Sequence, residues 1–312
     1  MKQFELLAIM PATTRTPTNP ALHLIDAHGY TAILLPKSRP SILLPKSRKQ
    51  ALSDAAIRQA HLESCMSSGP LVVCRPDCVL TEGDILGLVN ANRQLLDDLT
   101  ARLAGKVQYQ ITVSWAPEGV LTQFRESDEL APIFQAPRVA ADVLQHAVQT
   151  LADRMKNDIA GSLEIAAKDV LHLPTEDDML VNAVVLVNTD EVALLDNAVE
   201  QIDAIWTEGF RIRQIGPAPA GSFVLLDPQI VGKEEIAAAH RHLKLDEPST
   251  YSQIEEARKG ALRVAPERAE YTNHCARIAN ATLSARDDAP PLFLCHVRSE
   301  EMAATRPERQ VA

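Results

Sequence analysis

Residues 180–226 read LVNAVVLVNTDEVALLDNAVEQIDAIWTEGFRIRQIGPAPAGSFVLL, and this stretch decides the fold. It opens with a nearly continuous apolar run at residues 181–187, which is typical of a strand covered on both faces or central in a sheet. Apolar positions then recur at helical spacing until Gly209. Alternation at residues 210–213 and a second apolar run at residues 222–226 predict two further strands. The strand–helix–strand–strand order indicates an α+β arrangement.

A long helical pattern precedes this stretch at residues 139–171 and keeps one apolar stripe. A straight helix of that length would run about 50 Å, so a break near Gly161 is expected. Together, this helix and the strands suggest a ferredoxin-like sandwich, in which helices back one sheet. We assign this C-terminal domain to residues 139–230.

The first part of the chain predicts another α+β domain, at residues 1–116. Apolar runs at residues 4–9 and 23–35 predict a strand and a hairpin, because the turn His28-Gly29 interrupts the second run. Strict alternation at residues 106–115 predicts the clearest strand of the chain, which we expect to close this domain. Helices are expected at residues 51–66 and 82–104, with a buried strand at residues 71–73.

Two segments fall outside these domains. Residues 117–138 contain Pro117, Pro132 and Pro137 among several acids, which indicates a linker or surface excursion. Residues 231–312 carry helical patterns rich in charge and alanine, and predict a helical C-terminal tail. The fold class is therefore α+β with two domains, each a small mixed or antiparallel sheet backed by helices, followed by this tail.

One short sequence occurs twice, since ILLPKSR at residues 33–39 recurs letter for letter at residues 42–48. A single tandem copy is too short for a solenoid unit, so we interpret it as a duplicated strand end that lengthens one loop. Its basic residues could hold a phosphate or an acidic partner segment, although a solvated loop is the simpler interpretation. These basic residues are Lys37, Arg39, Lys46 and Arg48.

The composition excludes several classes of partner. The net charge of −10 repels phosphate backbones and anionic lipid surfaces, so we predict neither nucleic acid nor membrane as a partner. The N-terminal residues lack the apolar core of a signal peptide, and we expect the chain to stay in the cytoplasm. Five cysteines then indicate reduced thiols. The simplest interpretation of Cys74, Cys78, Cys275 and Cys295 is that they are small buried hydrophobes.

Motifs that carry chemistry are missing. Gly232-Lys233 lacks the other residues of a phosphate-binding loop, and no nucleophile elbow of the form G-x-S-x-G occurs. Cys74 and Cys78 flank what resembles a strand-ending turn, without a histidine pair nearby. His240 and His242 are two residues apart on an expected helix and so face different directions. We predict no enzymatic activity, no cofactor and no metal.

The stretch at residues 216–223, which we call the proline turn, suits partner docking better than ligand binding. Pro217 and Pro219 lack the N–H donors that would hold a phosphate or an oxyanion, whereas their rings stiffen the turn. Arg211 and Arg213 lie on the non-core face of the preceding strand, where they could pair with acids of a partner. The alternative is that the prolines only join two strands and the arginines are simply solvated. The predicted partner-binding residues are Arg211, Arg213, Pro217, Pro219 and Phe223.

The order of apolar strand, helix, basic alternating strand and Gly-Pro-x-Pro-x-Ser-Phe turn resembles the second domain of the gas vesicle protein GvpL/GvpF family. Gly216, Pro217, Pro219, Ser222 and Phe223 stand at the motif positions. The resemblance extends more weakly to GPLVVCRP at residues 69–76 and RLAGKVQYQITVSW at residues 102–115, and covers most of residues 1–230. The chain departs from the family at Ala218 and Gly221, where the family often has an aromatic residue, and at Cys74-Arg75-Pro76, which stands in place of a longer Pro-x-Arg-Phe-Gly-Thr stretch.

The resemblance implies a noncatalytic accessory protein of gas vesicle formation. Such a protein would be a minor gas vesicle component within the cytoplasm, and would bind the small hydrophobic shell protein (GvpA-type) and other accessory proteins during nucleation or assembly. No catalytic residue carries over from the family. The alternative is a small-molecule sensor or enzyme with its site in the cleft between the two domains.

Overall fold

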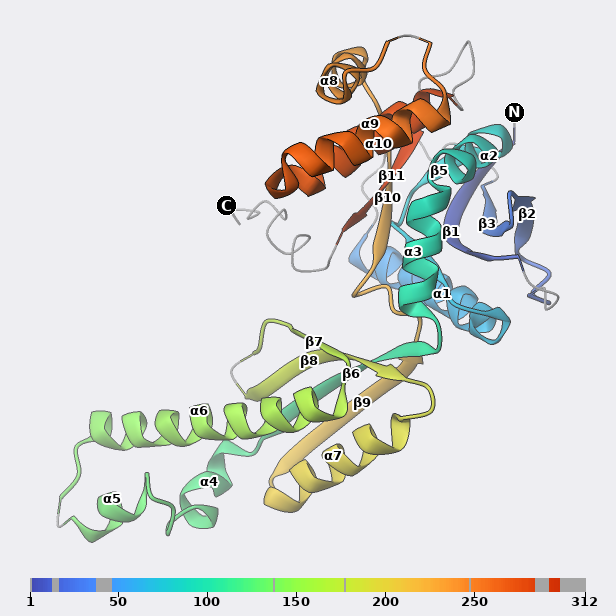
Figure 1. Ribbon diagram of the computed structural model, residues 1–312. Helices are drawn as coiled ribbons and strands as arrows, with labels where there is room; N and C mark the ends of the chain where they lie inside the picture. The colour runs from blue at the N-terminus through green and yellow to red at the C-terminus, as the bar shows by residue number, and fades with distance from the viewer. Residues whose placement is uncertain are drawn as a thin grey trace. The chain divides into compact units, whose positions relative to one another are not determined.

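The computed structural model describes residues 2–12, 17–37, 47–136, 138–176, 178–246 and 248–283, together with the backbone of residues 292–297. The chain folds into two units (Figure 1). Unit 1 combines Met1–Ala104 with Val224–Ala312, and unit 2 is Gly105–Phe223. Each unit contains a sheet backed by helices, so the predicted α+β class is confirmed. The boundaries differ from those predicted, because the end of the chain returns to the first unit.

Unit 1 is built on a mixed sheet in the order β11-β10-β4-β1-β3-β2, with β5 pairing with β1. The predicted hairpin of β2 and β3 is present, and both residues of its turn, His28 and Gly29, have positive φ. That geometry matches the right-handed twist of the two strands. The strands are β1 Gln3–Pro11, β2 His23–Ala27, β3 Tyr30–Lys37, β4 Val72–Cys74, β5 Val79–Thr81, β10 Leu225–Ile230 and β11 Leu292–Val297.

The helices of unit 1 are α1 Arg48–Cys65, α2 Glu82–Ala91, α3 Arg93–Leu103, α8 Lys233–Leu243, α9 Tyr251–Val264 and α10 Ala269–Leu283, with 3-10 turns at Met66–Ser68 and Pro266–Arg268. Thr81 and Asp84 form a capping box that starts α2. The single helix predicted for residues 82–104 is instead two helices, broken at Asn92. After this break, Leu96 of α3 is buried and Leu95 is only partly buried.

The segment predicted as a C-terminal tail belongs to unit 1. Its helices α8, α9 and α10 pack around a common core in which Ile254, Cys275 and Ile278 meet Ala91 of α2. Strand β11 of this segment also joins the sheet, since it pairs antiparallel with β10, which precedes the segment and pairs in parallel with β4. Hydrogen bonding to β4 therefore attaches this end of the chain to the first unit.

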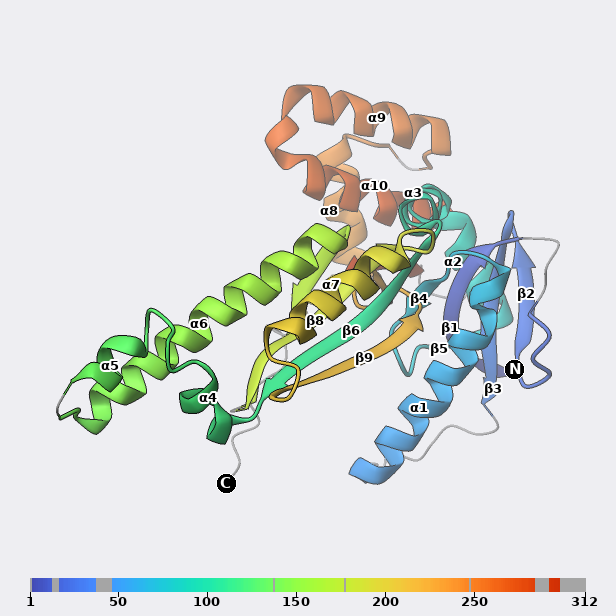
Figure 2. The same ribbon diagram turned by 90° about the horizontal axis from the view of Figure 1, so that it is seen from below.

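Unit 2 has the ferredoxin-like topology. Its sheet has the order β7-β8-β6-β9, and every neighbouring pair is antiparallel. Helices α6 and α7 lie on one face of this sheet (Figures 1 and 2). The elements are β6 Lys106–Trp115, α4 Pro117–Gln123, α5 Ala131–Gln135, α6 Ala141–Ala166, β7 Asp169–His172, β8 Met179–Asn188, α7 Val192–Ile205 and β9 Phe210–Ala218.

Several predictions for this unit need correction. Strand β6, expected to close the first domain, lies at the centre of the second sheet between β8 and β9. Helix α6 passes Gly161 unbroken and ends at Ala166, and residues 169–172, predicted as helix, form strand β7. The strand expected at residues 222–226 begins at Leu225 and joins the sheet of unit 1.

The predicted linker at residues 117–138 carries α4 and α5, and Val120 and Leu130 are buried there, so most of it is folded structure. The duplicated ILLPKSR loop lies largely at residues 38–46, outside the described residues. In the described part of the chain, no helix combines the length and apolar character needed to cross a membrane.

Candidate interaction surface

Strand β9 forms one edge of the unit 2 sheet, because β6 is its only partner strand among the described residues. It is also the most exposed strand of that sheet. Its residues from Arg213 to Pro217 are exposed, and the side chain of Ile215 keeps 44% of its area open to solvent. An exposed edge strand offers both side chains and backbone groups to a partner.

The register of β9 against β6 divides its side chains between two faces. Arg211 stands opposite Ser114 and Arg213 opposite Thr112, while Gln214 is opposite the buried Ile111. The Gln214 side chain lies on the helix-covered face, where its Nε2 donates a hydrogen bond to Asp196 Oδ1 of α7 at 3.2 Å. Successive side chains alternate across a strand, so Arg211, Arg213 and Ile215 share the opposite face, as the sequence predicted for the arginines. We call these three residues the basic face.

The two arginines of the basic face are unpaired. Within the described residues, neither guanidinium has a hydrogen bond or an ion pair, and both side chains are exposed. The β6 residues opposite them, Ser114 and Thr112, carry no charge. A guanidinium group binds carboxylates through planar, bidentate hydrogen bonds, so this face is suited to an acidic partner.

Where the proline turn begins, near the end of β9, the backbone has a conformation that only glycine fits. Gly216 has a φ of 146°, and a Cβ added there would stand 2.6 Å from Tyr109 Cδ1 and 2.9 Å from the Gln108 carbonyl oxygen. The Gly216–Pro217 peptide bond is cis. The Ser222 N–H donates to Gln108 Oε1 at 2.9 Å and ties the turn back to β6.

The structure separates the five predicted partner-binding residues into two groups. Arg211, Arg213 and Pro217 are exposed along β9. Pro219 is buried, and Phe223 keeps only 2% of its surface exposed, so these two support the turn and offer no contact area. Ile215 was not among the predicted residues, although it continues the alternation of Arg211 and Arg213 and could have been identified from that pattern.

A family model described as gas vesicle synthesis protein GvpL/GvpF matches residues 18–225 of this chain. The chain belongs to the GvpL/GvpF family. Two solved structures are similar in fold to this family member. The gas vesicle protein GvpF from Anabaena sp. PCC7120 is 18% identical with a TM-score of 0.53, and covers 70% of this chain and 94% of its own length. GvpF from Microcystis aeruginosa is 20% identical with a TM-score of 0.50, and the corresponding coverages are 70% and 96%. No curated protein matches the chain.

The family match includes β9 and the whole proline turn, whereas helices α8 to α10 lie beyond it. The predicted family assignment is therefore confirmed, on a match that contains both the basic face and the turn motif.

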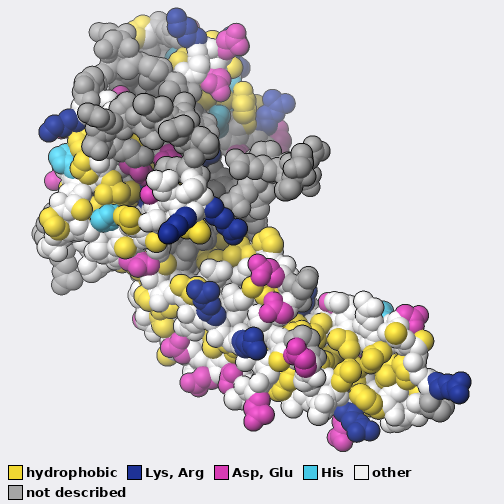
Figure 3. All heavy atoms as spheres, turned by 180° about the vertical axis from the view of Figure 1, so that it is seen from behind, with side chains coloured by type: hydrophobic (Ala, Val, Ile, Leu, Met, Phe, Trp, Pro, Cys, Tyr) yellow, Lys and Arg dark blue, Asp and Glu magenta, His cyan; other side chains and the backbone are white. Residues whose placement is uncertain are grey.

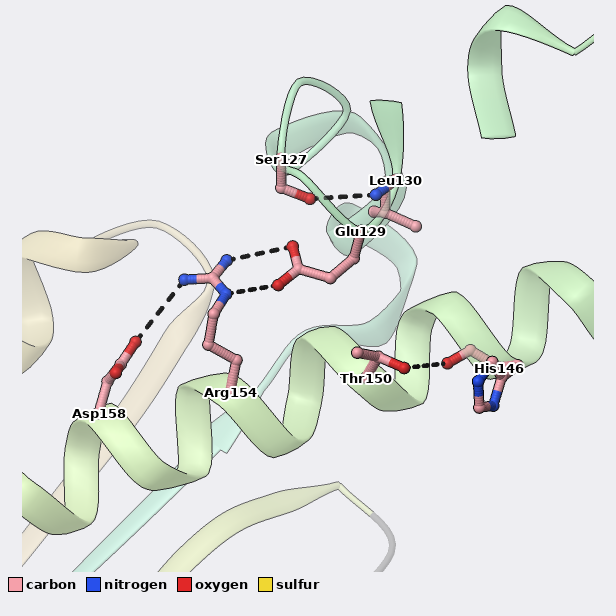
Figure 4. A network of polar contacts seen from close by, with 7 residues as sticks. All are labelled: Ser127, Glu129, Leu130, His146, Thr150, Arg154 and Asp158. Carbon is pink, nitrogen blue, oxygen red and sulfur yellow. Dashed lines mark hydrogen bonds and ion pairs between the residues drawn. The ribbon is translucent and has the colours of Figure 1, made fainter. Parts of the chain in front are cut away.

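In this GvpL/GvpF family member, a salt bridge anchors the excursion between β6 and α6. Arg154 of α6 donates from Nε to Glu129 Oε1 at 2.5 Å and from Nη2 to Glu129 Oε2 at 3.4 Å (Figure 4). Its Nη1 also lies 3.6 Å from Asp158 Oδ2. The Arg154 hydrogen bonds hold the pKa of Glu129 below its usual range. The excursion is thus held on α6 by a bidentate contact.

Hydrophobic side chains gather at the end of unit 2 that carries α4 and α5, on the face drawn in Figure 3. The exposed large hydrophobics of this part of the chain are Phe134, Val139 and Val143, of which Val143 is half exposed. Phe134 falls within the predicted linker at residues 117–138, whereas Val139 and Val143 fall within the predicted long helix.

A polar pocket of about 160 Å³ lies in unit 1, where the junction of α2 and α3 meets α9 and α10. Two of its charged side chains, Arg258 and Glu255, are paired with each other. Arg258 donates to Glu255 through Nε at 2.7 Å and Nη2 at 2.8 Å, and to Asn273 Oδ1 through Nη1 at 2.9 Å. The hydrogen bonds from Arg258 lower the pKa of Glu255, so this carboxylate stays ionised, and the bond from Arg258 to Asn273 links α9 to α10.

The thiols of the Cys-x-x-x-Cys pair are held protonated. Burial is the main cause that raises the pKa of Cys74 well above its ordinary value, and burial followed by the charge of Asp227 raises the pKa of Cys78 to about 11. Nucleophilic attack and metal binding both require the thiolate. Among the described residues, no group of three or more histidine, cysteine or acidic side chains is arranged to hold a metal ion.

Proposed function

We propose that this protein is a noncatalytic accessory protein of gas vesicle formation, which binds the hydrophobic shell protein during assembly through the basic face and Pro217. The observation that carries the proposal is the pair of unpaired arginines beside exposed Ile215, on an edge strand within the region that matches the family. We also propose the other gas vesicle accessory proteins as partners, and the gas vesicle within the cytoplasm as the place of action.

Charge supports a specific contact here. The chain as a whole carries a net charge of −10, so two neighbouring cations that have no acidic partner among the described residues form a local exception. Complementary charge fixes the orientation of a partner and speeds its association. Ile215 adds apolar area at the same place, and such area supplies affinity when a partner covers it.

The noncatalytic role is supported by the state of the titratable groups. Cys74 and Cys78 are protonated thiols, and Glu129 and Glu255 are carboxylates paired with arginines. None of these four is poised to exchange a proton near neutral pH. The alternative, a small-molecule sensor or enzyme with a site between the domains, rests on the sequence alone.

The test is capture of the shell protein by the full-length chain. The double variant Arg211→Glu/Arg213→Glu reverses the basic face, and Lys259→Glu/Arg263→Glu on exposed positions of α9 changes the net charge by the same amount. We expect the first variant to capture at least about tenfold less shell protein than the intact chain captures. The second variant should capture as much as the intact chain. Equal capture by the two variants contradicts the proposed surface. Floating vesicles in cells that lack the gene contradict the proposed function.

A further inference from the structure

We infer that the free edge of β9 binds an extended, acidic segment of another protein, which adds to the unit 2 sheet as a fifth strand. This inference rests on the proposed function, because it specifies how the same surface holds its partner.

The backbone of β9 directs hydrogen-bonding groups toward its free edge, where such a strand would add. The Ala116 N–H donates to the Gly209 carbonyl at 2.9 Å, which marks residues 116 and 209 as a hydrogen-bonded pair at the start of the β6–β9 ladder. Hydrogen-bonded pairs recur at every second residue of an antiparallel ladder, so Arg211 and Arg213 bond to β6. Ile212 and Gln214 consequently direct their N–H and C=O groups toward the free edge.

The edge has a defined length. No described residue bonds to the outward N–H groups of Ile212 and Gln214. The strand opens at Phe210, and Pro217 ends its capacity to donate because proline has no N–H. The Phe210 N–H already donates to the Trp206 carbonyl at 2.8 Å, so the usable edge spans residues 211–216, which is close to the usual length of a strand.

The side chains define the chemistry of the added strand. Residues that stand opposite Arg211, Arg213 and Ile215 would form non-hydrogen-bonded pairs, in which side chains approach most closely. Carboxylates fit opposite the two arginines, and an apolar side chain fits opposite Ile215. Because the other pairs of this sheet are antiparallel, the segment reads apolar-x-acidic-x-acidic from its N-terminus.

A second copy of the same chain does not fit this edge. An antiparallel pair of β9 strands centred on Arg213 would place the two copies of Arg213 directly opposite each other. Like charges in that position destabilise the pairing. The unpaired arginines thus select a different, acidic segment.

The experiment measures binding of a fluorescein-labelled peptide to the full-length chain. The peptide alternates threonine with one valine and two glutamates, in the order given above, and a control peptide has lysine in place of each glutamate. Gln214→Pro removes an outward N–H and leaves the bonds to β6 in place. Gln214→Ala is the matched control, because it loses the same side-chain bond to Asp196 but keeps the N–H.

We expect Gln214→Ala to bind the acidic peptide within about twofold of the intact chain. We expect Gln214→Pro and Arg211→Glu/Arg213→Glu to bind at least about tenfold more weakly, and the lysine peptide not to bind. Hydrogen exchange of the intact chain provides a second measurement that needs no variant. The Ile212 and Gln214 amides should become protected when the acidic peptide binds.

Equal binding by Gln214→Pro and Gln214→Ala, unchanged exchange at the two amides, or no binding of the acidic peptide by the intact chain each overturns strand addition. The proposed function is judged separately, by capture of the shell protein. If reversal of the basic face abolishes that capture while Gln214→Pro preserves it, the surface binds its partner through side chains alone and only the present inference fails.

Discussion

Replacing Gly216 with alanine should destabilise unit 2 by about 3 kcal/mol. Two costs contribute. A φ of 146° is a conformation that L side chains rarely adopt, and holding a residue there costs about 1–3 kcal/mol. The new Cβ would also stand 2.9 Å from the Gln108 carbonyl oxygen and 2.6 Å from the Tyr109 ring. Neither neighbour can retreat freely, because Gln108 lies in the β6 ladder and Tyr109 is 7% exposed. This overpacking adds about 1–3 kcal/mol to the destabilisation. Alanine also restricts the unfolded chain more than glycine does, which offsets about 0.5–1 kcal/mol of the loss.

The assay is urea unfolding followed by tryptophan fluorescence. The protein has 2 tryptophans, Trp115 and Trp206, and both lie in unit 2, so the signal reports on that unit. With an m-value of about 1.5 kcal/mol/M, a loss of 3 kcal/mol lowers the unfolding midpoint by about 2 M.

Gly161→Ala is the matched control. Gly161 lies inside α6 with no atom near its would-be Cβ, so alanine there should stabilise the unit by about 0.5–1 kcal/mol. The two substitutions should therefore move the midpoint in opposite directions. If Gly216→Ala leaves the midpoint unchanged, or if both variants shift it the same way, the reasoning about the proline turn is refuted.

Three further outcomes follow from the same structure. Gly209→Ala places a methyl group within 2.2 Å of the Trp206 ring, so we expect the free energy of unfolding to fall by about 2–4 kcal/mol and the emission maximum to shift to the red. An unshifted spectrum would contradict this packing. Glu129→Gln should lower the free energy of unfolding by about 0.5–1 kcal/mol at neutral pH. The loss is small because Arg154 is half exposed. The pKa of Glu129 is lowered in the folded state, so its contribution is present above the unfolded pKa of about 4.3 and is lost as pH falls through the folded value. In thermal melts, the difference in melting temperature between Glu129→Gln and the unaltered chain should be smaller at about pH 3 than at pH 7. Cys74 should react with a thiol reagent only in denaturant, and rapid native labelling of its peptide by mass spectrometry would show that it is accessible.

The candidate surface could be predicted from the sequence only in part. The alternation of Arg211 and Arg213 with apolar residues is local, so the exposure of both arginines followed from the strand period. The burial of Pro219 and Phe223 could not be inferred in this way, because burial depends on what covers a residue and not on its neighbours along the chain. The uncharged residues opposite the arginines depend likewise on which strand pairs with β9, and that strand lies about a hundred residues earlier.

The sequence by itself determined the type and order of β6, α6, β8, α7 and β9. It did not determine the ferredoxin-like topology, because it assigned β6 to the first domain and predicted helix where β7 lies. Helix and strand periods are set by side chains within a few residues of each other, so they can be read along the chain. Tertiary structure alone decided which sheet each strand joins. Strand β6 pairs with β8 and β9 and so belongs to the second unit, while β10 crosses back to β4 and takes the three C-terminal helices into the first. Strand pairing depends on backbone groups that every residue carries, so side-chain patterns cannot name the partner strand.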